Sequence, residues 1–426
     1  MKILVIGGGG REHALVWKIS QSPLVDEIYC IPGNAGIARI ARCEAMGATE
    51  IENLADFARN KGIDLTVVGP ELPLTLGIVD YFKSAGLKIY GPGKTASQLE
   101  GSKSFAKNLM KKYRIPTGEY QTFTSPSQAK AYLNKVSFPC VIKADGLAAG
   151  KGVIIVFDDG EASSAIDLIM EKKSFGEAGD QIVIEEYLEG EEASFLAFTD
   201  GETVLPLPTS QDHKPVYDGD TGPNTGGMGA YSPAPVISDA LHKRIMEEIM
   251  IPTVQAMGAE GKNYQGILYA GLMIKNDQAR VLEFNVRLGD PETQALLMRI
   301  KSDLVPILLA ASEKRLSQIK IELDKRASVC VVMASQGYPG KYEKGKEIQG
   351  LKEVEDLSEV EVFHAGTAAK EGKTITSGGR VLGVTALGEG IDAAINQAYQ
   401  VVAKISWEGA YFRRDIGKKA LDLHEK

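Results

Sequence analysis

The chain has 426 residues, of which 44% are hydrophobic and 24% are charged, as in ordinary soluble globular proteins. This length allows roughly three domains. A formal net charge of −8 argues against general binding of nucleic acid or of an anionic membrane. No apolar run reaches the roughly 18 residues that a membrane helix needs, and the apolar start is too short for a signal peptide. We therefore expect a cytoplasmic protein.

The cysteines support the same compartment. Cys30, Cys43, Cys140 and Cys330 form no C-x-x-C pair, and three of them lie in or beside apolar runs. Buried free thiols in a reducing compartment are therefore expected.

Residues 1–100 alternate short apolar runs with helical patterns. The runs at 2–7, 27–33, 65–70 and 87–92 each end in Gly or Pro, and a helical segment at 11–20 separates the first two. This is the spacing of βαβ units. We predict a parallel sheet with helices on both faces.

The rest of the chain predicts mixed structure. A helix is expected over 104–113, where Phe105, Leu109 and Tyr113 have helical spacing. Strands are expected at 140–144, 153–157, 182–188, 271–275, 280–288, 327–334, 359–366 and 380–388. A final helix has an apolar face made of Ile391, Ala394, Ile395, Ala398, Val402 and Ile405.

A first glycine-rich stretch, "VIGGGGREH", follows the first strand and opens a helix. It misses the dinucleotide fingerprint, because the sixth position is Glu12 counted from Gly7, or His13 counted from Gly8. NAD binding is thereby disfavoured. Free N–H groups and the helix dipole favour a single phosphate, with a plain tight turn as the alternative. The candidate phosphate-binding residues are Gly8, Gly9, Gly10 and Arg11.

A second stretch, "DGLAAGKGV" at 145–153, lies between two predicted strands. It is not a Walker A loop, since only three residues separate Gly146 from Gly150, and Gly152 stands where a Ser or Thr is required. Its many exposed backbone N–H groups suit an anion. A lid over a phosphate and a simple hairpin turn both stay open on this evidence.

The strand at 280–288 carries the strongest chemical signal. Alternation places Glu283, Asn285 and Arg287 on one face, and Phe284, Val286 and Leu288 on the other. A carboxylate and an amide oxygen suit magnesium, and a guanidinium can hold a phosphate that develops charge. We predict a metal site at Glu283 and Asn285, with a solvated polar face as the alternative.

A third glycine-rich stretch, residues 210–235, is long, polar and without a regular period. Such loops within compact domains are usually functional or disordered. Its backbone amides could wrap a small polar substrate. Candidate binding residues are Asp212, Lys214, Asn224 and Gly227.

Together these segments resemble the phosphoribosylamine–glycine ligase family, whose members are ATP-grasp enzymes of purine biosynthesis. The resemblance runs along the whole chain in the family's order. It is carried by "GGGGREHAL", "PGNAG", "VVGPE", "LEGSK", "KADGLAAGKGV", "EEYLEGEEAS", "TSQDHK", "TGPNTGGMGAYSPAP", "EFNVRLGDPETQ" and "SGGRVLGVTALG".

The resemblance implies an α/β and α+β multidomain fold with an ATP-grasp core. An N-terminal Rossmann-like parallel-sheet domain would cover 1–102, and a small α+β cap domain would cover 326–426. The ATP-grasp domain would consist of 103–122 and 190–325, with a lid over 123–189. The loop at 145–153 would close over the triphosphate.

The resemblance also implies site residues. Glu185 and the Leu188 backbone would bind adenine, and Glu192 would bind the ribose. The other nucleotide-binding residues would be Lys103, Lys143, Gly150, Lys151, Gly152 and Lys214. Glu283 and Asn285 would bind Mg²⁺ or Mn²⁺, although the preceding strand offers no further acidic ligand, so the number of metal ions stays open. Arg287, Lys143 and Asp290 would act in catalysis.

The implied reaction joins glycine to 5-phosphoribosylamine, with cleavage of ATP to ADP and phosphate through glycyl phosphate. The phosphate of phosphoribosylamine would rest on residues 8–11, with Asn34 near its ribose. Asp212 and Asp290 would hold the glycine ammonium. The alternatives are another ATP-grasp carboxylate–amine ligase, a dehydrogenase, or a nucleotide sensor without activity. We expect a monomer, or a homodimer, with small-molecule partners only.

Overall fold

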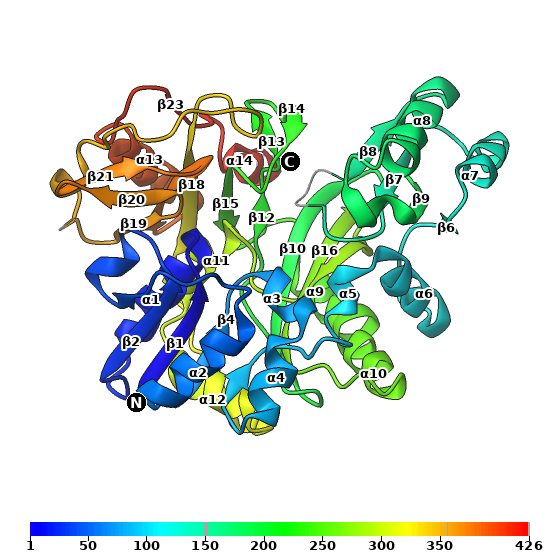
Figure 1. Ribbon diagram of the computed structural model, residues 1–426. Coiled ribbons are helices and arrows are strands. Elements are labelled where there is room, and N and C mark those ends of the chain that lie inside the picture. The colour runs from blue at the N-terminus through cyan, green and yellow to red at the C-terminus, as the bar shows by residue number, and fades with distance from the viewer. Residues whose placement is uncertain (149–151, 356, 425–426) are drawn as a thin grey trace.

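The computed structural model describes residues 1–148, 152–355 and 357–424. Figure 1 shows a broad body from which one small lobe projects. Within these residues the strands form four main sheets and two small hairpins, one of β13 Pro215–Tyr217 and β14 Thr221–Asn224, the other of β20 Thr367–Lys370 and β21 Lys373–Thr376. Within the described residues, no helix is both long and apolar enough to cross a membrane. All four cysteines are free thiols; Cys30, Cys140 and Cys330 are buried as expected, whereas Cys43 is only partly buried.

The N-terminal region is the predicted parallel sheet, with strand order β3-β2-β1-β4-β5. Alternate residues of β1 enter different hydrophobic clusters, Ile3 and Val5 in one and Leu4 and Ile6 in the other, so both faces are covered. Its elements are β1 Lys2–Gly7, α1 Gly10–Ser20, β2 Glu27–Pro32, β3 Arg42–Cys43, α2 Ile51–Lys61, β4 Leu65–Val68, α3 Glu71–Leu76, α4 Ile78–Ser84, β5 Ile89–Tyr90 and α5 Gln98–Gly101.

The centre of the molecule holds an antiparallel sheet of order β11-β10-β16-β17, here called the core sheet. Helix α6 precedes it in the chain, and α9 to α12 lie between or after its strands. Its elements are α6 Lys103–Tyr113, β10 Glu191–Thr199, β11 Val204–Pro206, α9 Asp239–Ile245, α10 Ile251–Ala259, β16 Gly266–Lys275, β17 Gln278–Asn285, α11 Glu292–Arg299 and α12 Leu304–Ser312.

Residues 120–186 form the projecting lobe, here called the outer lobe (Figure 1). It contains an antiparallel sheet of order β6-β9-β7-β8 and its own hydrophobic cluster. The predicted strands on either side of the 145–153 loop pair with each other, β7 with β8. Its elements are β6 Tyr120–Phe123, α7 Pro126–Tyr132, β7 Cys140–Ala144, β8 Val153–Val156, α8 Asp159–Ile166 and β9 Ile182–Glu186.

The last hundred residues, together with β12 Gln211–Asp212 and β15 Gly229–Ser232, build the C-terminal sheet, of order β12-β15-β18-β22-β19 with β23 beside β18. The final amphipathic helix packs on it as α13, with Ala394, Ala398 and Val402 buried. Its elements are β18 Ala327–Ser335, β19 Val360–His364, β20 Thr367–Lys370, β21 Lys373–Thr376, β22 Arg380–Gly388, α13 Ile391–Val402, β23 Ala410–Tyr411 and α14 Lys418–His424.

Two expectations on secondary structure were wrong. Segment 210–235 is not an irregular loop, because it holds β12 Gln211–Asp212, β13 Pro215–Tyr217, β14 Thr221–Asn224 and β15 Gly229–Ser232. Strand β15 pairs with β18 of the C-terminal sheet. These strands have two to four residues, too few to show a period. In addition, β17 ends at Asn285, because the Val286 N–H donates to Glu100 Oε2 instead of to a neighbouring strand.

Candidate active site

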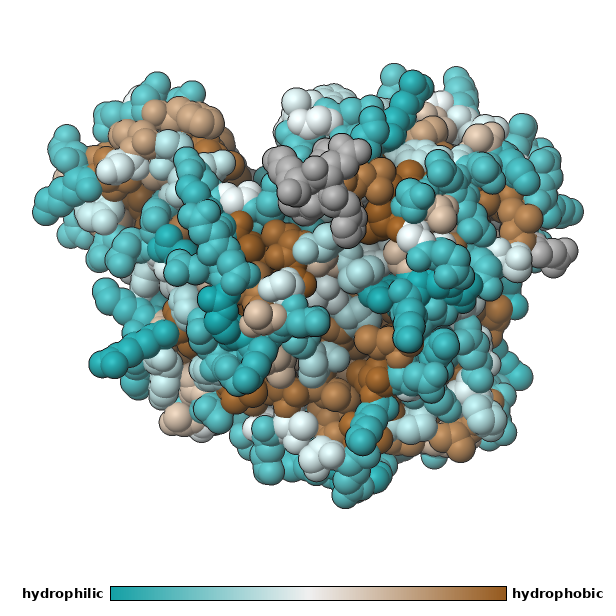
Figure 2. Space-filling model, turned by 180° about the vertical axis from the view of Figure 1, so that it is seen from behind, coloured by the Kyte–Doolittle hydropathy of each residue, from teal (hydrophilic) through white to brown (hydrophobic). Residues whose placement is uncertain are grey.

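The candidate site lies where the outer lobe faces the core sheet. In the view from behind, a notch separates the outer lobe from the body of the molecule (Figure 2). Four lysines and three carboxylates converge there from α6, β7, β9, β10, the β12–β13 connection and β17. We call them the lysine cluster: Lys103, Lys107, Lys143 and Lys214 with Glu185, Glu192 and Glu283.

Glu185, the fourth residue of β9, is the most enclosed carboxylate of the cluster. Its Oε2 atom lies 3.0 Å from Lys143 Nζ and 2.9 Å from Lys107 Nζ, and all three side chains are buried. Lys143 also donates to the Leu282 carbonyl at 3.2 Å. That carbonyl lies at a β-bulge, where the register of β16 and β17 shifts. The bulge frees a backbone acceptor for Lys143.

Lys103 begins α6 and holds the start of the 145–153 loop. Its Nζ donates to the carbonyls of Ala144 at 2.9 Å and Gly146 at 3.0 Å. Burial lowers the pKa of Lys103, although Glu283 opposes that change. Gly152 is buried, and a Cβ there would lie 2.6 Å from Ala148 Cβ. Gly150 and Lys151 lie outside the described residues.

Glu192 of β10 and Lys214 form a partly exposed ion pair. Burial opposes the charge of Lys214, but Glu192, Glu283 and Asp212 together raise its pKa. Leu188 is buried in the connection after β9, beside a cavity of about 260 Å³ that Glu186, Met273 and Arg280 also line. This volume is close to the lower end of small-ligand sites, roughly 300 Å³.

Glu283 and Asn285 share one face of β17, as predicted. They pair with Gly271 and Tyr269 of β16, which places all four on the side of the core sheet that carries Glu192. Burial raises the pKa of Glu283, but Lys214, Lys143, Lys103 and Arg287 lower it overall, so the carboxylate is charged.

The donor set fits a magnesium ion. Neither the Glu283 carboxylate nor the Asn285 amide has a hydrogen bond or ion pair with the described residues, so their oxygens are free to bind. Within that part of the chain, no group of three or more His, Cys, Asp or Glu could hold a metal. Two protein oxygens suffice for magnesium when phosphates and water complete the shell.

Arg287 has turned away from the face that the sequence assigned to it. Beyond the end of β17, its Nε lies 3.2 Å from Glu71 Oε2, and its Nη2 lies 3.1 Å from Glu100 Oε1. Both carboxylates belong to the N-terminal region. Burial opposes the charge, yet Glu100 and Glu71 raise the pKa of Arg287. Arg287 thus joins the core sheet to the N-terminal region.

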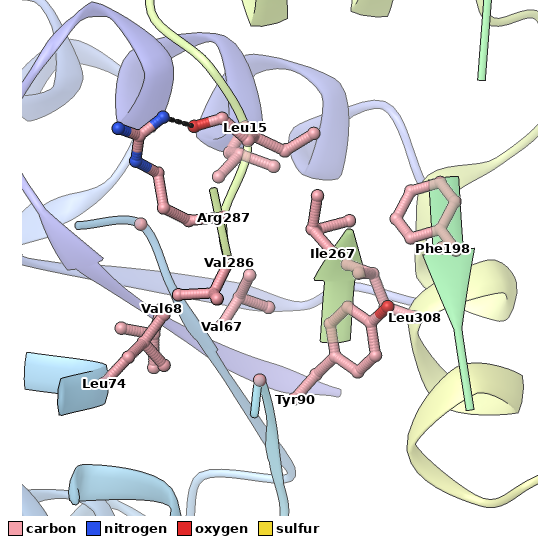
Figure 3. A pocket seen from close by; sticks show the side chains of 13 residues that line it. Leu15, Val67, Val68, Leu74, Tyr90, Phe198, Ile267, Val286, Arg287 and Leu308 are labelled. Atoms are coloured by element: carbon pink, nitrogen blue, oxygen red, sulfur yellow. Dashed lines mark hydrogen bonds between the residues drawn. The ribbon is translucent and has the colours of Figure 1, made fainter. Parts of the chain in front are cut away.

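A small cavity of about 20 Å³ lies beside Arg287, between β4–β5 and β16. Figure 3 shows Val67, Tyr90, Phe198 and Ile267 around it, with the guanidinium at its edge. It has room for little more than one water molecule. This space belongs to the packing between the two sheets and is not a substrate site.

Asp212 and Glu292 form a second acidic pair. Burial and the Glu292 charge raise the pKa of Asp212, although Lys214 opposes them. Glu292 Oε1 accepts hydrogen bonds from Tyr269 Oη at 2.6 Å and Ser194 Oγ at 3.2 Å. Asp212 Oδ2 and Glu292 Oε2 have no hydrogen-bond partner among the residues that the structure describes. Two enclosed carboxylates with free oxygens favour a cation.

The loop before β15 closes over this pair. Gly227 has φ +110°, and a Cβ there would lie 2.4 Å from Pro291 Cδ and 2.7 Å from Asp212 Oδ1. Only glycine therefore lets this backbone approach the acidic pair. Asn224, in contrast, lies on the exposed strand β14.

The N-terminus of α1 already holds carboxylates. The Gly9 N–H donates to Glu12 Oε2 at 2.6 Å, and the Arg11 N–H donates to Asp290 Oδ2 at 3.2 Å. The Arg11 guanidinium contacts Glu12 Oε1 at 2.5 Å and the Leu288 carbonyl at 3.1 Å. Within the predicted phosphate site, the protein's own acidic side chains take these donors.

Asp290 connects three regions. Besides Arg11, it accepts a hydrogen bond from Gln294 at 2.9 Å and lies 3.5 Å from Arg380 Nη1 of β22. Burial opposes its ionisation, but Arg380 and Arg11 lower the pKa of Asp290. Arg380 also donates to the Gly226 carbonyl at 2.6 Å.

Asn34, like Asp290, forms hydrogen bonds to more than one region of the chain. Its Nδ2 donates to the carbonyls of Gly8 at 2.9 Å and His364 at 2.8 Å, while its Oδ1 accepts from the N–H groups of Gly36 and Ile37. Its amide thus connects the first glycine-rich loop to the C-terminal sheet.

Sequence reasoning missed Lys107, Glu292 and Arg380. Lys107 lies one turn after Lys103 on a predicted helix, and this i, i+4 spacing was a usable signal. Glu292 lies in the quoted segment "GDPETQ", but nothing local distinguishes it from Asp290. No local pattern indicates Arg380, which reaches the site only through the pairing of β22 with β18.

The fold is that of an ATP-grasp enzyme, and the model of an ATP-grasp (A) domain matches residues 101–293. A biotin carboxylase domain from Hydrogenobacter thermophilus, solved with magnesium ADP and bicarbonate, has the same fold at 16% identity, with a TM-score of 0.74 over 96% of this chain and 91% of that chain.

The chain belongs to the phosphoribosylglycinamide synthetase family, because models of the family's N domain, ATP-grasp (A) domain and C domain match residues 1–100, 101–293 and 328–419. It is 55% identical over 429 aligned positions to a phosphoribosylamine–glycine ligase of Salmonella typhi, with both chains fully covered. The crystal structure of a phosphoribosylamine–glycine ligase from Thermotoga maritima is 35% identical, with a TM-score of 0.86 over 98% of this chain and 100% of that chain.

Proposed function

We propose that the chain joins glycine to 5-phosphoribosylamine with cleavage of ATP, and so forms glycinamide ribonucleotide, ADP and phosphate for purine biosynthesis. The observation that carries this proposal is the lysine cluster around Glu283 and Asn285, in a chain that aligns over its full length with ligases of that name. The cluster supplies fixed positive charge beside two free oxygen ligands.

The proposed chemistry has two steps. A glycine carboxylate oxygen attacks the γ-phosphorus of ATP, the bond to the β-phosphate oxygen breaks, and ADP leaves. The amine of phosphoribosylamine then attacks the carbonyl carbon of glycyl phosphate, expels phosphate and loses a proton. Such phosphoryl transfer depends on positioning and on charge neutralisation more than on a nucleophilic side chain.

The nucleotide would lie along the notch. Glu185 and the Leu188 backbone would bind the base, and Glu192 the ribose. Lys103, Lys143 and Lys214 would face the phosphates, while residues 150–152 would cover them and exclude water from the acyl phosphate. Glu283 and Asn285 would hold magnesium, or manganese in its place, which supplies charge neutralisation on phosphate oxygens.

Glycine would bind by its ammonium at the acidic pair. Asp212 and Glu292 offer free carboxylate oxygens, and burial, with the neighbouring Glu292 charge, raises the pKa of Asp212, so a bound cation would stabilise its charged form. Asp290, the other residue considered for this role, has its carboxylate between Arg11, Arg380 and Gln294. Glu292 is therefore the better second ligand.

Phosphoribosylamine would lie near residues 8–11 and Asn34, in front of Asp290 and Arg287. Asn224 and Gly227 would border this end of the site. We also propose the domain boundaries given from the sequence, a cytoplasmic location, and a monomer or homodimer.

The test is product analysis. The protein would be incubated with ATP, magnesium, glycine and freshly generated phosphoribosylamine, and ADP and the amide would be measured by mass. Stoichiometric amide that vanishes without glycine is expected. ADP without the amide would indicate another ATP-grasp carboxylate–amine ligase, and no ADP from folded protein would refute the proposed function.

A further inference from the structure

The two oxygens of Glu185 have different surroundings. Oε2 receives both buried ammonium groups, from Lys143 and Lys107. Oε1 is buried as well, but it has no hydrogen-bond partner. A buried carboxylate oxygen without a donor costs free energy, so its persistence points to a ligand that supplies one.

Lys107, which belongs to the core, is one of the two lysines that bind Oε2 of Glu185. It projects from α6, is almost fully buried, and donates to Thr117 Oγ1 at 2.8 Å besides its contact with Glu185. Thr117 Oγ1 in turn donates to the Val281 carbonyl at 2.7 Å. The ammonium is therefore held in place by β17, and it can hold Glu185 in one orientation.

Arg280 of β17 binds the neighbouring residue Glu186 and the backbone at Thr117. Its guanidinium contacts Glu186 Oε1 at 3.0 Å and Oε2 at 2.7 Å, and it donates to the Thr117 carbonyl at 3.0 Å. Both chain segments that connect the outer lobe to the core, near Thr117 and near Glu185–Glu186, are thus bound to the core by one lysine and one arginine.

We propose that Lys107 is a positioning residue for recognition of the purine base, because it holds Glu185 so that Oε1 accepts a hydrogen bond from the exocyclic amino group of adenine. The inference rests on the proposed function in one respect, that a nucleotide binds in the notch. Guanine presents a carbonyl oxygen at the equivalent position. Two acceptors would then face each other, and a guanine nucleotide would be rejected.

The experiment measures binding of ADP and of GDP, each with magnesium, to the full chain by calorimetry. Lys107→Met is expected to weaken ADP binding about 10-fold or more, since a hydrogen bond to a charged group is lost or misdirected. GDP binding should change much less, so the preference for ADP falls. Lys107→Arg, which keeps a cation, should restore most of the preference.

Lys111→Met is the matched control. Lys111 lies one turn further along α6, is exposed, and has its ammonium 5.7 Å from the centre of the Tyr120 ring, so the same charge is removed at a distance from Glu185. ADP and GDP affinities should match those of the unmodified protein.

The pH dependence of ADP binding is a second measurement, and it can be made on the unmodified protein. Lys107 faces Glu185 of β9, Lys143 of β7, Arg280 of β17 and the Tyr120 ring of β6. Burial, the largest cause, lowers the pKa of Lys107 to about 8. ADP affinity of the unmodified protein should fall as the pH rises above about 8, whereas Lys107→Arg should show no such fall.

The failures can be told apart. If the unmodified protein binds neither nucleotide, the proposed function fails. If it prefers ADP and Lys107→Met keeps that preference, or if Lys107→Arg shows the same pH profile as the unmodified protein, Lys107 serves only the fold and the inference is overturned.

Discussion

Between the outer lobe and the core sheet, the four lysines of the lysine cluster lie near its three carboxylates, and Glu185, Glu283 and Asn285 keep oxygens without partners in the described chain. At the N-terminus of α1, in contrast, Glu12 and Asp290 accept the N–H groups of Gly9 and Arg11. Both regions carry a glycine-rich sequence typical of an anion site. The lysine cluster keeps charged groups free to bind a ligand, whereas the N–H donors at the N-terminus of α1 are already bound to the protein's own carboxylates.

The glycines of the first loop explain the difference. A Cβ at Gly7 would lie 2.5 Å from Glu12 Cγ, and one at Gly69 would lie 2.0 Å from Glu12 Oε1. These glycines make room for the Glu12 carboxylate at the carboxyl ends of β1 and β4, where doubly wound sheets usually hold a ligand. A glycine-rich turn therefore indicates that some group lies close to the backbone, and that group can be a side chain of the protein itself.

The largest expected effect comes from Glu283→Ala at the notch. Without the only carboxylate of the predicted metal site, turnover at ordinary magnesium should fall at least about 100-fold. Steady-state rates over a range of magnesium concentrations would measure this. Glu247→Ala, an exposed helix position, is the control, and a near-normal rate for Glu283→Ala would refute the metal assignment.

Asp290→Ala should act mainly on stability. It breaks a buried pair with Arg380 and removes an acceptor at α1, so the free energy of unfolding should fall by about 3 kcal/mol at pH 7. The pKa of Asp290 is lowered in the fold, so its contribution is present above the unfolded pKa of about 3.9 and is lost as the pH falls through the folded value.

Urea unfolding would measure the Asp290 effect. Asp56→Ala, whose exposed partner is Arg59, should change the unfolding free energy by less than about 1 kcal/mol. A loss of turnover by Asp290→Ala without loss of stability would place Asp290 on the substrate instead.

Glu292→Gln and Asp212→Asn should raise the KM for glycine about 10-fold and leave the KM for ATP nearly unchanged. The pKa of Asp212 is raised, so its carboxylate charges further as the pH rises. The KM for glycine should therefore fall with rising pH in the unmodified protein, and less in Asp212→Asn. Equal effects on both substrates would argue against the ammonium site.

A last effect concerns stability in acid and two buried histidines, His13 in α1 and His364 at the end of β19. His364 N–H donates to His13 Nδ1 at 2.7 Å, and burial lowers the pKa of His13 to about 3 and of His364 to about 4. The unfolded chain takes up these protons near pH 6.5, so stability should fall below that pH, by about 1.4 kcal/mol per pH unit for each histidine.

His13→Asn retains an acceptor for His364 but does not titrate. Urea midpoints between pH 7.5 and 5 should fall less steeply in this variant. An unchanged pH dependence would show that other groups cause the acid sensitivity.

The arrangement of side chains along β17 could be predicted from the local sequence. The alternation along 280–288 placed Glu283 and Asn285 on one face, and the core positions Phe284, Val286 and Leu288 are buried as predicted. Arg287 does not lie on that face, because β17 ends before it. Glu100, from another part of the chain, accepts the Val286 N–H and pairs with the Arg287 guanidinium. The roles of these residues in binding and catalysis stay predictions.

By itself, the sequence determined the parallel N-terminal sheet, the strand pair around the 145–153 loop and the shared face of Glu283 and Asn285 on β17, since each depends on residues close together in the chain. The family followed from motifs along the whole chain. Only the tertiary structure decided which charges are already paired. Asp290, Arg287 and Arg380 find partners across as many as 279 positions of sequence separation, and such separations carry no local period. Electrostatic partnership depends on separation in space, and the fold alone sets that separation.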